Sequence, residues 1–523
     1  MIFSGISPKS VPLKIEKFKH NFVDVITREQ TIFPPEKFQF LNKIGYLSKV
    51  DWNGNQLNRL WRYNQHYFDD LNAKNSEDRE NFHYNLIIDW VRNNPVKSGV
   101  GWEPYPTSLR VVNWIKWLLR GNSLPAIGVA SLATQSRWLS SRLEYHILGN
   151  HLFANAKALI FAGLSFNGPE AKNWLSKGIS IVDKELAEQI LEDGGNFELS
   201  PMYHSIFLED LLDLINIFKC YPQKVPEDLV KTLRFKVSKM LYWLEIMSHP
   251  DGEISFFNDS SLGVAPTLKQ LICYASRLDI FKNEKQGSHK ITHLKDSGYI
   301  RVKYGSVNAL LDVAKLGPNY LPGHAHADTL SFELSFLKHR VFVNSGTSEY
   351  ENSKIRLNER GTAAHNTVVI DNQDSSETWS SFRVARRAVP SNLSLNEIDD
   401  QVNISCSHNG YKRLSGKVIH HRKWRFQKNL FTIYDNILGK ASKAIAFYHF
   451  HPNVNVFALR PECYKLVLSK NLSLLFEIEK GKSRLIDSFY SPKFGLRIQN
   501  KAIQVALDKN RLSVVSLKWG ITN

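Results

Sequence analysis

The hydrophobic period of the chain changes near residue 285, and this change limits the folds that the sequence can adopt. From about residue 77 to 285, apolar residues recur every three or four positions, which is the spacing of a helix that buries one face. Five segments show this spacing most clearly: 82–92, 108–119, 130–145, 150–163 and 204–218. Helices of this kind joined by short loops predict stacked helical hairpins.

Beyond the change, residues 297–523 alternate in the way that is typical of strands. The clearest runs are 309–313, 341–343, 367–370 and 444–448, with turn-forming residues between them. Many short strands with turns predict an antiparallel β-sandwich.

The length of 523 residues is too great for one ordinary core, so two or three domains are expected. We predict an extended N-terminal arm at 1–50, a helical domain at 51–285 and a β-sandwich domain at 290–523. The boundary between the last two falls at about 280–296, a polar stretch.

The net charge of +17 predicts an acidic partner. Nucleic acid, an anionic membrane surface and an acidic polysaccharide all fit this charge. The basic residues are spread along the chain without a long run, and no zinc-finger or RNA-binding signature is present, which disfavours nucleic acid. The 12 Trp, 19 Tyr and 30 Phe suit contacts with sugar rings, although most of them are expected in the core. The spread of basic charge fits a long groove better than a helix that reads DNA, and charge alone does not choose between the acidic partners.

The four cysteines are far apart and form neither a disulfide framework nor a C-x-x-C site, so a reducing compartment is allowed. Residues 1–19 lack the apolar core of a signal peptide, and no window reaches the length of a membrane span. We expect a cytoplasmic protein, or a periplasmic one if the native start lies upstream. The sequence leaves the oligomeric state open.

A site is predicted in residues 322–336, which open with a Pro-Gly turn. His324, His326 and Asp328 stand at alternate positions, so in a strand they share one face. Apolar residues continue that face from Leu330 to Phe336. The pattern indicates polar groups at the mouth of a buried strand, and His-x-His is a common metal-ligand spacing. The alternative is an exposed hairpin end.

Three more polar clusters lie inside apolar segments. Asn150 and His151 open a helix, where the alternative role of Asn150 is an N-cap. Residues 196–204 precede another helix, and residues 360–367 lead into a strand. Together the clusters supply a base, a tyrosine hydroxyl as acid, and donors that can hold a carboxylate, which are the groups needed to abstract an acidic C–H proton.

These clusters, taken in order, resemble the heparinase II/III-like family of polysaccharide lyases. The resemblance rests on Asn150-His151-Leu152, on Ser200-Pro201-Met202-Tyr203-His204, on Gly323-His324-Ala325-His326-Ala327-Asp328 and on Ala363-Ala364-His365-Asn366-Thr367-Val368. Residues 102–110 and the turn 256–259 also resemble the family. The resemblance implies an incomplete (α/α) toroid followed by an antiparallel β-sandwich, and enzymes that cleave uronic-acid glycans by β-elimination.

Roles follow from the resemblance residue by residue. Asn150 and His151 match the pair that neutralises the uronate carboxylate, Tyr203 matches the acid that protonates the leaving oxygen, and His324 matches a catalytic histidine. Whether His151, Tyr203 or His324 is the base stays open. Candidate substrate-binding residues are Glu198, His204, Arg110 and Arg360, with Lys157, Arg383, Arg386 and Arg387 as further basic guides.

The resemblance also implies a structural zinc ion, with His326 and His365 as two ligands. The third family ligand is usually Asp, whereas this chain has Asn344. A neutral amide oxygen binds Zn²⁺ more weakly than a carboxylate. Without zinc, these three side chains can still form a hydrogen-bonded brace.

We therefore predict a lyase that acts on a uronate-containing acidic polysaccharide. A C5-epimerase is the first alternative, because it also removes H5 but returns the proton to the opposite face. A non-catalytic glycan-binding protein in surface polysaccharide biosynthesis is the second, and a nucleic-acid binder, which rests on charge alone, is the third.

Overall fold

The computed structural model describes residues 22–281 and 289–520. They form two compact units, and each unit is made of segments that are not continuous in sequence. Unit 1 contains residues up to 190 together with 207–238 and 270–281, and unit 2 contains 191–206, 239–269 and the chain from 282 onward. The expected boundary at 280–296 falls partly outside the described residues. Two segments that we assigned to the helical domain, 191–206 and 239–269, therefore belong with the β-rich unit.

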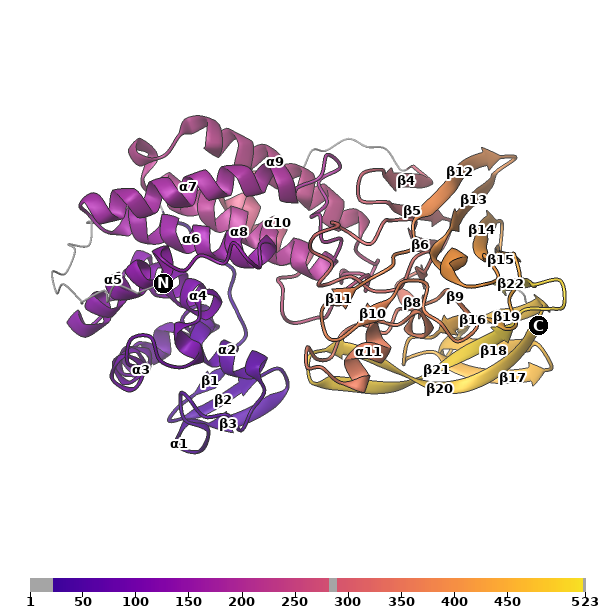
Figure 1. The fold of residues 1–523 in the computed structure, drawn as a ribbon, viewed down its shortest axis with the longest axis horizontal. Helices are drawn as coiled ribbons and strands as arrows, with labels where there is room; N and C mark the ends of the chain where they lie inside the picture. Colours follow the sequence, from indigo (N-terminus) through magenta and orange to yellow (C-terminus); the bar gives the residue numbers. More distant parts are fainter. Residues whose placement is uncertain (1–21, 282–288, 521–523) are drawn as a thin grey trace. The chain divides into compact units, whose positions relative to one another are not determined.

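Unit 1 is built from helices, as the sequence predicts (Figure 1). In chain order they are α1 (Leu47–Val50), α2 (Arg59–Tyr67), α3 (Glu80–Asn93), α4 (Pro104–Leu119), α5 (Ala126–Ser140), α6 (Gly149–Ser165) and α7 (Pro169–Gln189). The helices α8 (Pro201–Cys220), α9 (Glu227–Ile246) and α10 (Leu268–Arg277) follow, each with a part of its length in unit 2.

The structure describes the expected N-terminal arm, residues 1–50, only from residue 22 onward. Residues 1–21 lie outside the described part of the chain, and the following segment folds into a three-stranded antiparallel sheet of β1 (Ile32–Phe33), β2 (Lys37–Phe40) and β3 (Lys43–Tyr46). Phe38 and Phe40 on β2 pack edge-on against Trp52 and Trp61. These aromatic contacts pack the segment against the rest of unit 1.

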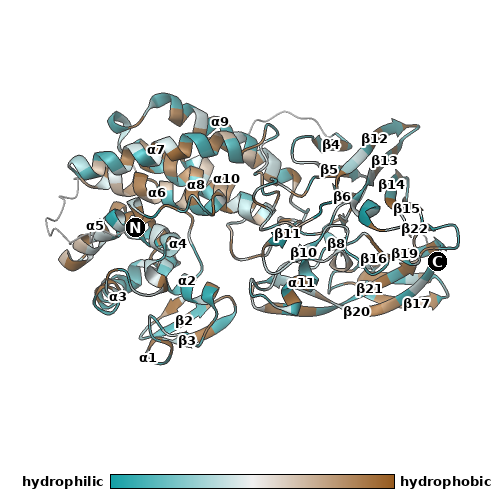
Figure 2. Ribbon diagram, viewed as in Figure 1, coloured by the Kyte–Doolittle hydropathy of each residue, from teal (hydrophilic) through white to brown (hydrophobic). Residues whose placement is uncertain are grey.

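The centre of unit 1 is α6, whose residues from Leu152 to Ser165 are all buried. It packs closely on α7 because glycines stand at the contact: a Cβ on Gly163 would lie 2.6 Å from the backbone nitrogen of Leu175. The outer helices α7 and α9 carry both hydrophilic and hydrophobic residues (Figure 2). Among the described residues, no helix has the length and hydrophobicity needed to cross a membrane.

The described residues of unit 2 form three antiparallel sheets of four or more strands and one two-stranded hairpin. The first has the order β4-β5-β6-β7-β8, the second β12-β13-β14-β15-β22-β19-β18-β17, and the third β20-β21-β16-β9. The five strands of the first sheet are β4 (Ile291–Leu294), β5 (Tyr299–Tyr304), β6 (Val307–Asp312), β7 (Phe332–Phe336) and β8 (His339–Phe342). The eight of the second are β12 (Pro390–Ile398), β13 (Gln401–His408), β14 (Ile419–Gln427), β15 (Leu430–Leu438), β17 (Asn455–Arg460), β18 (Cys463–Ser469), β19 (Leu472–Lys480) and β22 (Leu512–Lys518).

The remaining elements complete unit 2. The third sheet is formed by β9 (Val368–Ile370), β16 (Ala444–His449), β20 (Lys482–Lys493) and β21 (Leu496–Ala506). A helix, α11 (Lys354–Arg360), and a hairpin of β10 (Thr378–Trp379) and β11 (Arg383–Val384) lie between β8 and β12 in the chain.

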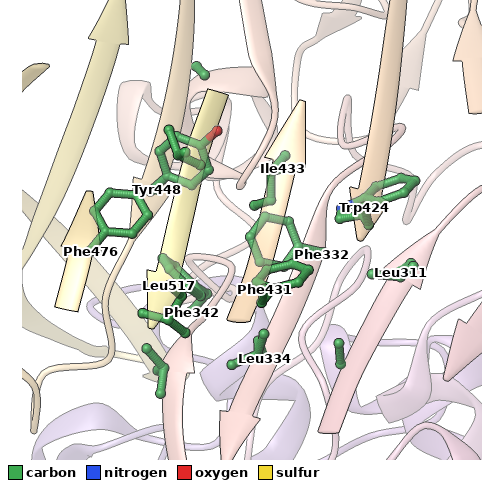
Figure 3. Close-up of a cluster of buried hydrophobic side chains, with 14 of the residues drawn as sticks. Leu311, Phe332, Leu334, Phe342, Trp424, Phe431, Ile433, Tyr448, Phe476 and Leu517 are labelled. Atoms are coloured by element: carbon green, nitrogen blue, oxygen red, sulfur yellow. The ribbon is translucent and has the colours of Figure 1, made fainter. Parts of the chain in front are cut away.

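Side chains from all three sheets meet in one core, which confirms the predicted sandwich (Figure 3). Residues along β14 alternate between buried and half-buried, which is the pattern of a strand with one face in a core. Phe332 of β7 contacts Phe431 of β15 at 5.8 Å between ring centroids, and Tyr448 of β16 contacts Phe476 of β19 at 5.4 Å. The fold class is therefore helices followed by an antiparallel β-sandwich.

Candidate active site

The stretch 322–336 does not form the continuous strand that alternation predicts. The strand β7 begins only at Phe332, and residues 323–331 form an irregular loop. The side chain of His324 is partly exposed, whereas His326 is buried. The carboxylate of Asp328 accepts the backbone N–H of Asn258 at 3.4 Å. The three residues are therefore placed by loop contacts and not by the strand period.

The loop is held by the turn at residues 258–259, which lies in unit 2. The backbone N–H of Asp259 donates to the carbonyl of His324 (3.0 Å), and the backbone N–H of His326 donates to Oδ1 of Asn258 (3.0 Å). The two segments thus pair although they are more than sixty residues apart in the chain. This pairing brings both imidazoles to the carboxylate of Asp259.

Asp259 is a fully buried carboxylate with four side-chain donors. His324 Nδ1 lies 2.8 Å from its Oδ2, and His326 Nε2 lies 2.8 Å from its Oδ1. Arg356 on α11 donates to both oxygens, and Thr347 Oγ1 donates weakly at 3.4 Å. Burial opposes ionisation of this group, but the Arg356 guanidinium and the two imidazoles outweigh it and hold the pKa of Asp259 well below its usual range.

An ionised Asp259 fixes the proton on His324. Because a carboxylate only accepts hydrogen bonds, the Nδ1 of His324 must carry the hydrogen. In the neutral imidazole, Nε2 is then the acceptor, and it points away from Asp259 with Glu198 Oε2 at 3.4 Å. The side chain of His324 is 14% exposed. The arrangement therefore presents a basic nitrogen of fixed orientation to a ligand.

Tyr203 lies directly against this histidine. The two rings are stacked with their centroids 3.8 Å apart and their planes at 29°. Tyr203 is placed by the first turn of α8, where its backbone N–H donates to Ser200 Oγ, and Ser200 Oγ donates in turn to the carbonyl of Asp259 (2.5 Å). The same turn that orients His324 therefore also positions Tyr203.

The hydroxyl of Tyr203 contacts the hydroxyl of Tyr350 at 2.9 Å. Burial, together with the charge of Asp259, raises the pKa of Tyr350 well above its usual value. Tyr350 therefore stays protonated and can donate to the oxygen of Tyr203. A hydroxyl that is held in this way can accept or release a proton at a defined position.

Two of the predicted substrate-binding residues of unit 2 are instead structural. His204 is fully buried, stacks on Trp243 at 4.3 Å and lies within hydrogen-bond distance of the Met240 carbonyl. Arg360 is also buried and donates to the carbonyls of Ala325 and Ser380. These contacts leave neither side chain available to a ligand, so the structure corrects both assignments.

Arg110 in unit 1 is corrected in the same way. Its guanidinium is fully buried, lies 3.9 Å from the Trp90 ring centroid and donates to Gln135 and to the carbonyls of His66 and Gly101. The side chain joins α2, α4 and α5 and has no exposed donor. Lys157, also in unit 1, is bound to Asp210 and Asp213.

Asn150 and His151 lie in unit 1, at the start of α6. The N-cap of α6 is Leu148 and makes no side-chain cap, so Asn150 is not the cap that its position suggested. The Asn150 side chain hydrogen-bonds to the hydroxyl of Tyr105, whose ring lies 4.4 Å from that of His151. His151 Nδ1 lies 3.0 Å from Glu144 Oε1, and its side chain is 26% exposed. The pair is therefore oriented by neighbours and partly accessible.

The three predicted zinc ligands are buried in unit 2. His326 Nδ1 lies 3.3 Å from His365 Nε2, and two nitrogens bound to one tetrahedral zinc would be about 3.3 Å apart. The other nitrogen of His326 is held by Asp259, as is usual for a zinc-bound histidine. Asn344 Oδ1 accepts the backbone N–H of Asn366 at 3.4 Å, and its Nδ2 has no hydrogen-bond partner among the described residues.

The two histidine nitrogens therefore fit a zinc site. The third position, Asn344, does not supply the carboxylate that is usual there. Within the described residues, no group of three His, Cys, Asp or Glu side chains could hold a metal ion. Burial lowers the pKa of His326 to about 4, so this imidazole is neutral. A neutral pair can also share one N–H···N hydrogen bond, which requires no metal.

Several residues of this site were not found from the sequence. The sequence indicated Asp259 only as part of a turn that resembles the family, with no role of its own. No motif in the sequence indicated Arg356, Tyr350 or Glu144. Glu144 is only 7 positions from His151. The other two lie far along the chain from the group that they contact: Arg356 is 97 positions from Asp259, and Tyr350 is 147 positions from Tyr203. Only a sequence comparison or a structure can bring such residues together.

The fold of this chain is that of several solved polysaccharide lyases. A crystal structure of heparinase III covers 88% of this chain and 75% of its own, with a TM-score of 0.69 at 17% identity. A heparan sulfate lyase mutant from Pedobacter heparinus covers 92% and 81%, with a TM-score of 0.62 at 18% identity. A chondroitin AC lyase from Streptomyces coelicolor is more distant, with a TM-score of 0.52 at 10% identity over 89% and 74% of the two chains.

The sequence itself shows the family. The heparinase II/III N-terminus pattern matches residues 14–288, and the heparinase II/III-like C-terminal pattern matches residues 286–516. The chain therefore belongs to the heparinase II/III-like family. Among curated relatives, a heparin-sulfate lyase of Bacteroides stercoris is 26% identical over 369 residues, and one of Pedobacter heparinus is 30% identical over 330 residues.

These matches cover 66% and 55% of this chain, and 51% and 47% of the two relatives. The chain thus spans about half the length of the curated relatives that it matches.

Proposed function

We propose that this protein is a polysaccharide lyase that cleaves a uronate-containing acidic glycan by β-elimination. The observation that carries the proposal is the stacked pair of Tyr203 and His324, with the imidazole held by the ionised Asp259. The pair supplies a basic nitrogen and a phenolic hydroxyl side by side. Family membership and relatives that are named heparin-sulfate lyases support the same reaction class.

The reaction requires loss of a weakly acidic proton from C5 of the uronate. In our assignment, Nε2 of His324 or the oxygen of an ionised Tyr203 takes this proton, and the electron pair of the C–H bond stays on an enolate-like intermediate. That pair then forms the C4–C5 double bond while the C4–O4 bond breaks. The leaving O4 keeps the bonding electrons and takes a proton from the hydroxyl of Tyr203.

A uronate carboxylate must be neutralised before its C5 proton can be lost easily, because the negative charge opposes a second one. We assign this role to Asn150 and His151, on the basis of their motif in unit 1. Glu144 orients His151 through Nδ1, which leaves Nε2 for a ligand. The positive net charge of the chain favours an anionic substrate in general.

A structural zinc remains part of the proposal. His326 and His365 would supply two nitrogens and Asn344 an amide oxygen, and a bound ion would brace the loop behind His324. Every proton transfer described above is carried by side chains of the protein alone.

The test is the ultraviolet absorbance of the C4–C5 double bond, measured with heparan sulfate, chondroitin sulfate, hyaluronan and alginate. We expect a rise with one of these glycans that is abolished in Tyr203→Phe. Deuterium uptake at C5 without a rise in absorbance would instead indicate the epimerase. Binding without either reaction would indicate a glycan-binding protein.

A further inference from the structure

The hairpin of β10 and β11 in unit 2 carries exposed aromatic and basic side chains that the catalytic residues do not use. Trp379 is 55% exposed and Phe382 is 41% exposed. Large apolar side chains in contact with water are worth explaining when they cluster beside a site.

Two buried arginines fix this hairpin to the loop of His324. Arg356 donates to the carbonyl of Ser381 in the hairpin turn and also holds Asp259. Arg360 donates to the carbonyl of Ser380 and to that of Ala325, the residue between the two histidines. Figure 1 shows β10, β11 and α11 close together. The turn is therefore held in place by the same side chains that hold the catalytic loop.

Phe382 connects the hairpin to the catalytic pair. Its ring lies 6.1 Å from that of His324 and 5.2 Å from that of Tyr350, both edge-on. Val384, also in the hairpin, packs against the buried cluster that contains Ala325. Trp379 is three positions before Phe382, so the Cα atoms of the two residues are at most about 11 Å apart.

Trp379 and Arg383 are directly opposite each other on the two strands. Side chains in such pairs lie on the same face with Cβ atoms about 5 Å apart. Arg383 is exposed, and within the described residues no hydrogen bond or ion pair engages its guanidinium. The other two arginines predicted as guides are used: Arg386 pairs with Glu377, and Arg387 donates to the carbonyls of Pro318 and Asn319.

We propose that the hairpin tip from Trp379 to Arg383 binds the sugar residue next to the one that is cleaved, in an acidic glycan. The indole of Trp379 would cover the apolar C–H face of the sugar ring, and the guanidinium of Arg383 would hold a carboxylate or sulfate on the same sugar, a geometry that its planar fork suits. The proposal rests on the proposed lyase function. Of the three arginines Arg383, Arg386 and Arg387, it assigns ligand binding to Arg383.

The test compares Trp379→Ala and Arg383→Gln with the unchanged protein on size-defined fragments of the four glycans named above. In each variant we expect KM for a hexasaccharide to rise about tenfold, because one stacking or one charged contact is lost, with kcat changed less than twofold. Equilibrium binding, measured in the Tyr203→Phe background, should weaken by the same factor.

The chain offers a matched control. Phe489 and Arg497 form an exposed aromatic–arginine pair on β20 and β21, with the guanidinium 4.2 Å from the ring centroid. The double variant Phe489→Ala/Arg497→Gln removes the same two kinds of side chain and should leave hexasaccharide KM unchanged. Thermal unfolding of all variants checks that each is folded.

The outcomes separate the two proposals. If the unchanged protein cleaves a glycan and the hairpin variants keep its KM for the hexasaccharide, the hairpin is not a sugar-binding surface, although the lyase stands. If the unchanged protein neither binds nor cleaves any of the four glycans, the lyase and the hairpin proposal are both overturned. An equal loss in the Phe489/Arg497 control would also overturn the hairpin proposal, because it would indicate a general effect of charge.

Discussion

Two buried carboxylates in unit 2, Asp259 and Asp435, are each held by one arginine and by a histidine that contacts a second histidine. Asp259 pairs with Arg356 and with His326, which contacts His365 at 3.3 Å. Asp435 pairs with both Nε and Nη2 of Arg422 and with His420, which contacts His408 at 3.2 Å. Each site is thus a chain of carboxylate, imidazole and imidazole with one arginine.

The two sites differ in what else reaches the carboxylate. The side chains of Asp435, Arg422 and His420 are completely buried, and Arg422 also donates to the carbonyls of Leu330 and Asn366. Asp259 has an additional partner, His324, which is partly exposed and stacked on Tyr203. The Asp435 site therefore holds backbone segments together inside the sandwich. The Asp259 site instead orients His324, a side chain that a ligand can reach.

The comparison also bears on zinc. Two imidazoles at 3.2 Å occur at Asp435, where His408 Nδ1 accepts the backbone N–H of Gly410 and its Nε2 is left to donate to His420. The close approach of two histidines is thus explained by a hydrogen bond there. At Asp259 a spacing of 3.3 Å between the imidazole nitrogens fits either a hydrogen bond or a bound metal.

The largest expected effect is on catalysis. Asp259→Asn would place an amide opposite His324 Nδ1, and its N–H₂ group would favour the wrong tautomer of the imidazole. We expect kcat to fall on the order of 10² to 10⁴-fold, by analogy with other carboxylate–histidine pairs. Asp435→Asn, measured per folded molecule, should change kcat less than about threefold. Equal losses in the two variants would contradict the distinction between the sites.

The second expected effect is on stability, and here the two sites should behave alike. Removing one partner of a buried ion pair leaves an uncompensated charge, which costs about 3–5 kcal/mol. Asp435→Asn and Asp259→Asn should both lower the free energy of unfolding by this amount in urea titrations. Asp487→Asn, which breaks an exposed pair with Lys501, serves as the control and should cost less than about 1 kcal/mol.

Zinc affinity should distinguish the two histidine pairs. Asn344→Asp supplies the carboxylate that the third position lacks, so we expect zinc to bind at least about tenfold more tightly than in the unchanged protein. Metal analysis after dialysis and competition with a chelator measure this. His365→Gln should remove the site, whereas His408→Gln should not affect it. An unchanged affinity in Asn344→Asp would show that residue 344 is not a ligand.

The smallest effect is on the dependence of stability on pH. Burial, with the neighbouring His420 next in importance, lowers the pKa of His408 well below its usual value. The unfolded chain therefore binds one more proton than the folded chain at pH values between the depressed pKa and about 6.5, so stability is lost as the pH falls below about 6.5. The contribution of one such histidine is about 1.4 kcal/mol per pH unit.

His408→Gln should reduce this slope by one proton, as measured by urea unfolding at several pH values from 7 to 5. His339→Gln, which replaces a half-exposed histidine on β8, is the control. A slope that is the same in His408→Gln and in the unchanged protein would mean that His408 is not the neutral group assumed here.

Much of the fold follows from local pattern. The five helical segments with the clearest three- to four-residue spacing appear as α3, α4, α5, α6 and α8, and the four alternating runs appear as β6, β8, β9 and β16. The boundaries differ by a few residues, and α5 ends at Ser140 where we expected helix to Tyr145. Hydrophobic period is a property of neighbouring residues, so it can be read from a sequence without knowing the tertiary structure.

The sequence motifs predict functional roles for Tyr203 and His324, and in the structure the two rings are in contact. Their roles stay a prediction. Site prediction from sequence failed for Arg110, His204 and Arg360, because a charged or polar residue gives the same sequence signal whether its side chain reaches a ligand or an internal carbonyl. Their burial depends on which segments pack around them.

The sequence alone determined the order of helices and strands, the family, and the identity of the tyrosine and histidine in the proposed site. The tertiary structure decided the rest: that residues 323–331 are a loop, that segments 191–206 and 239–269 join the β-rich unit, and that Asp259 and Arg356 orient His324. The physical reason is distance along the chain. The hydrophobic period depends on residues that are a few positions apart. The donors to a buried carboxylate come from segments that are distant in sequence and become neighbours only in the folded chain.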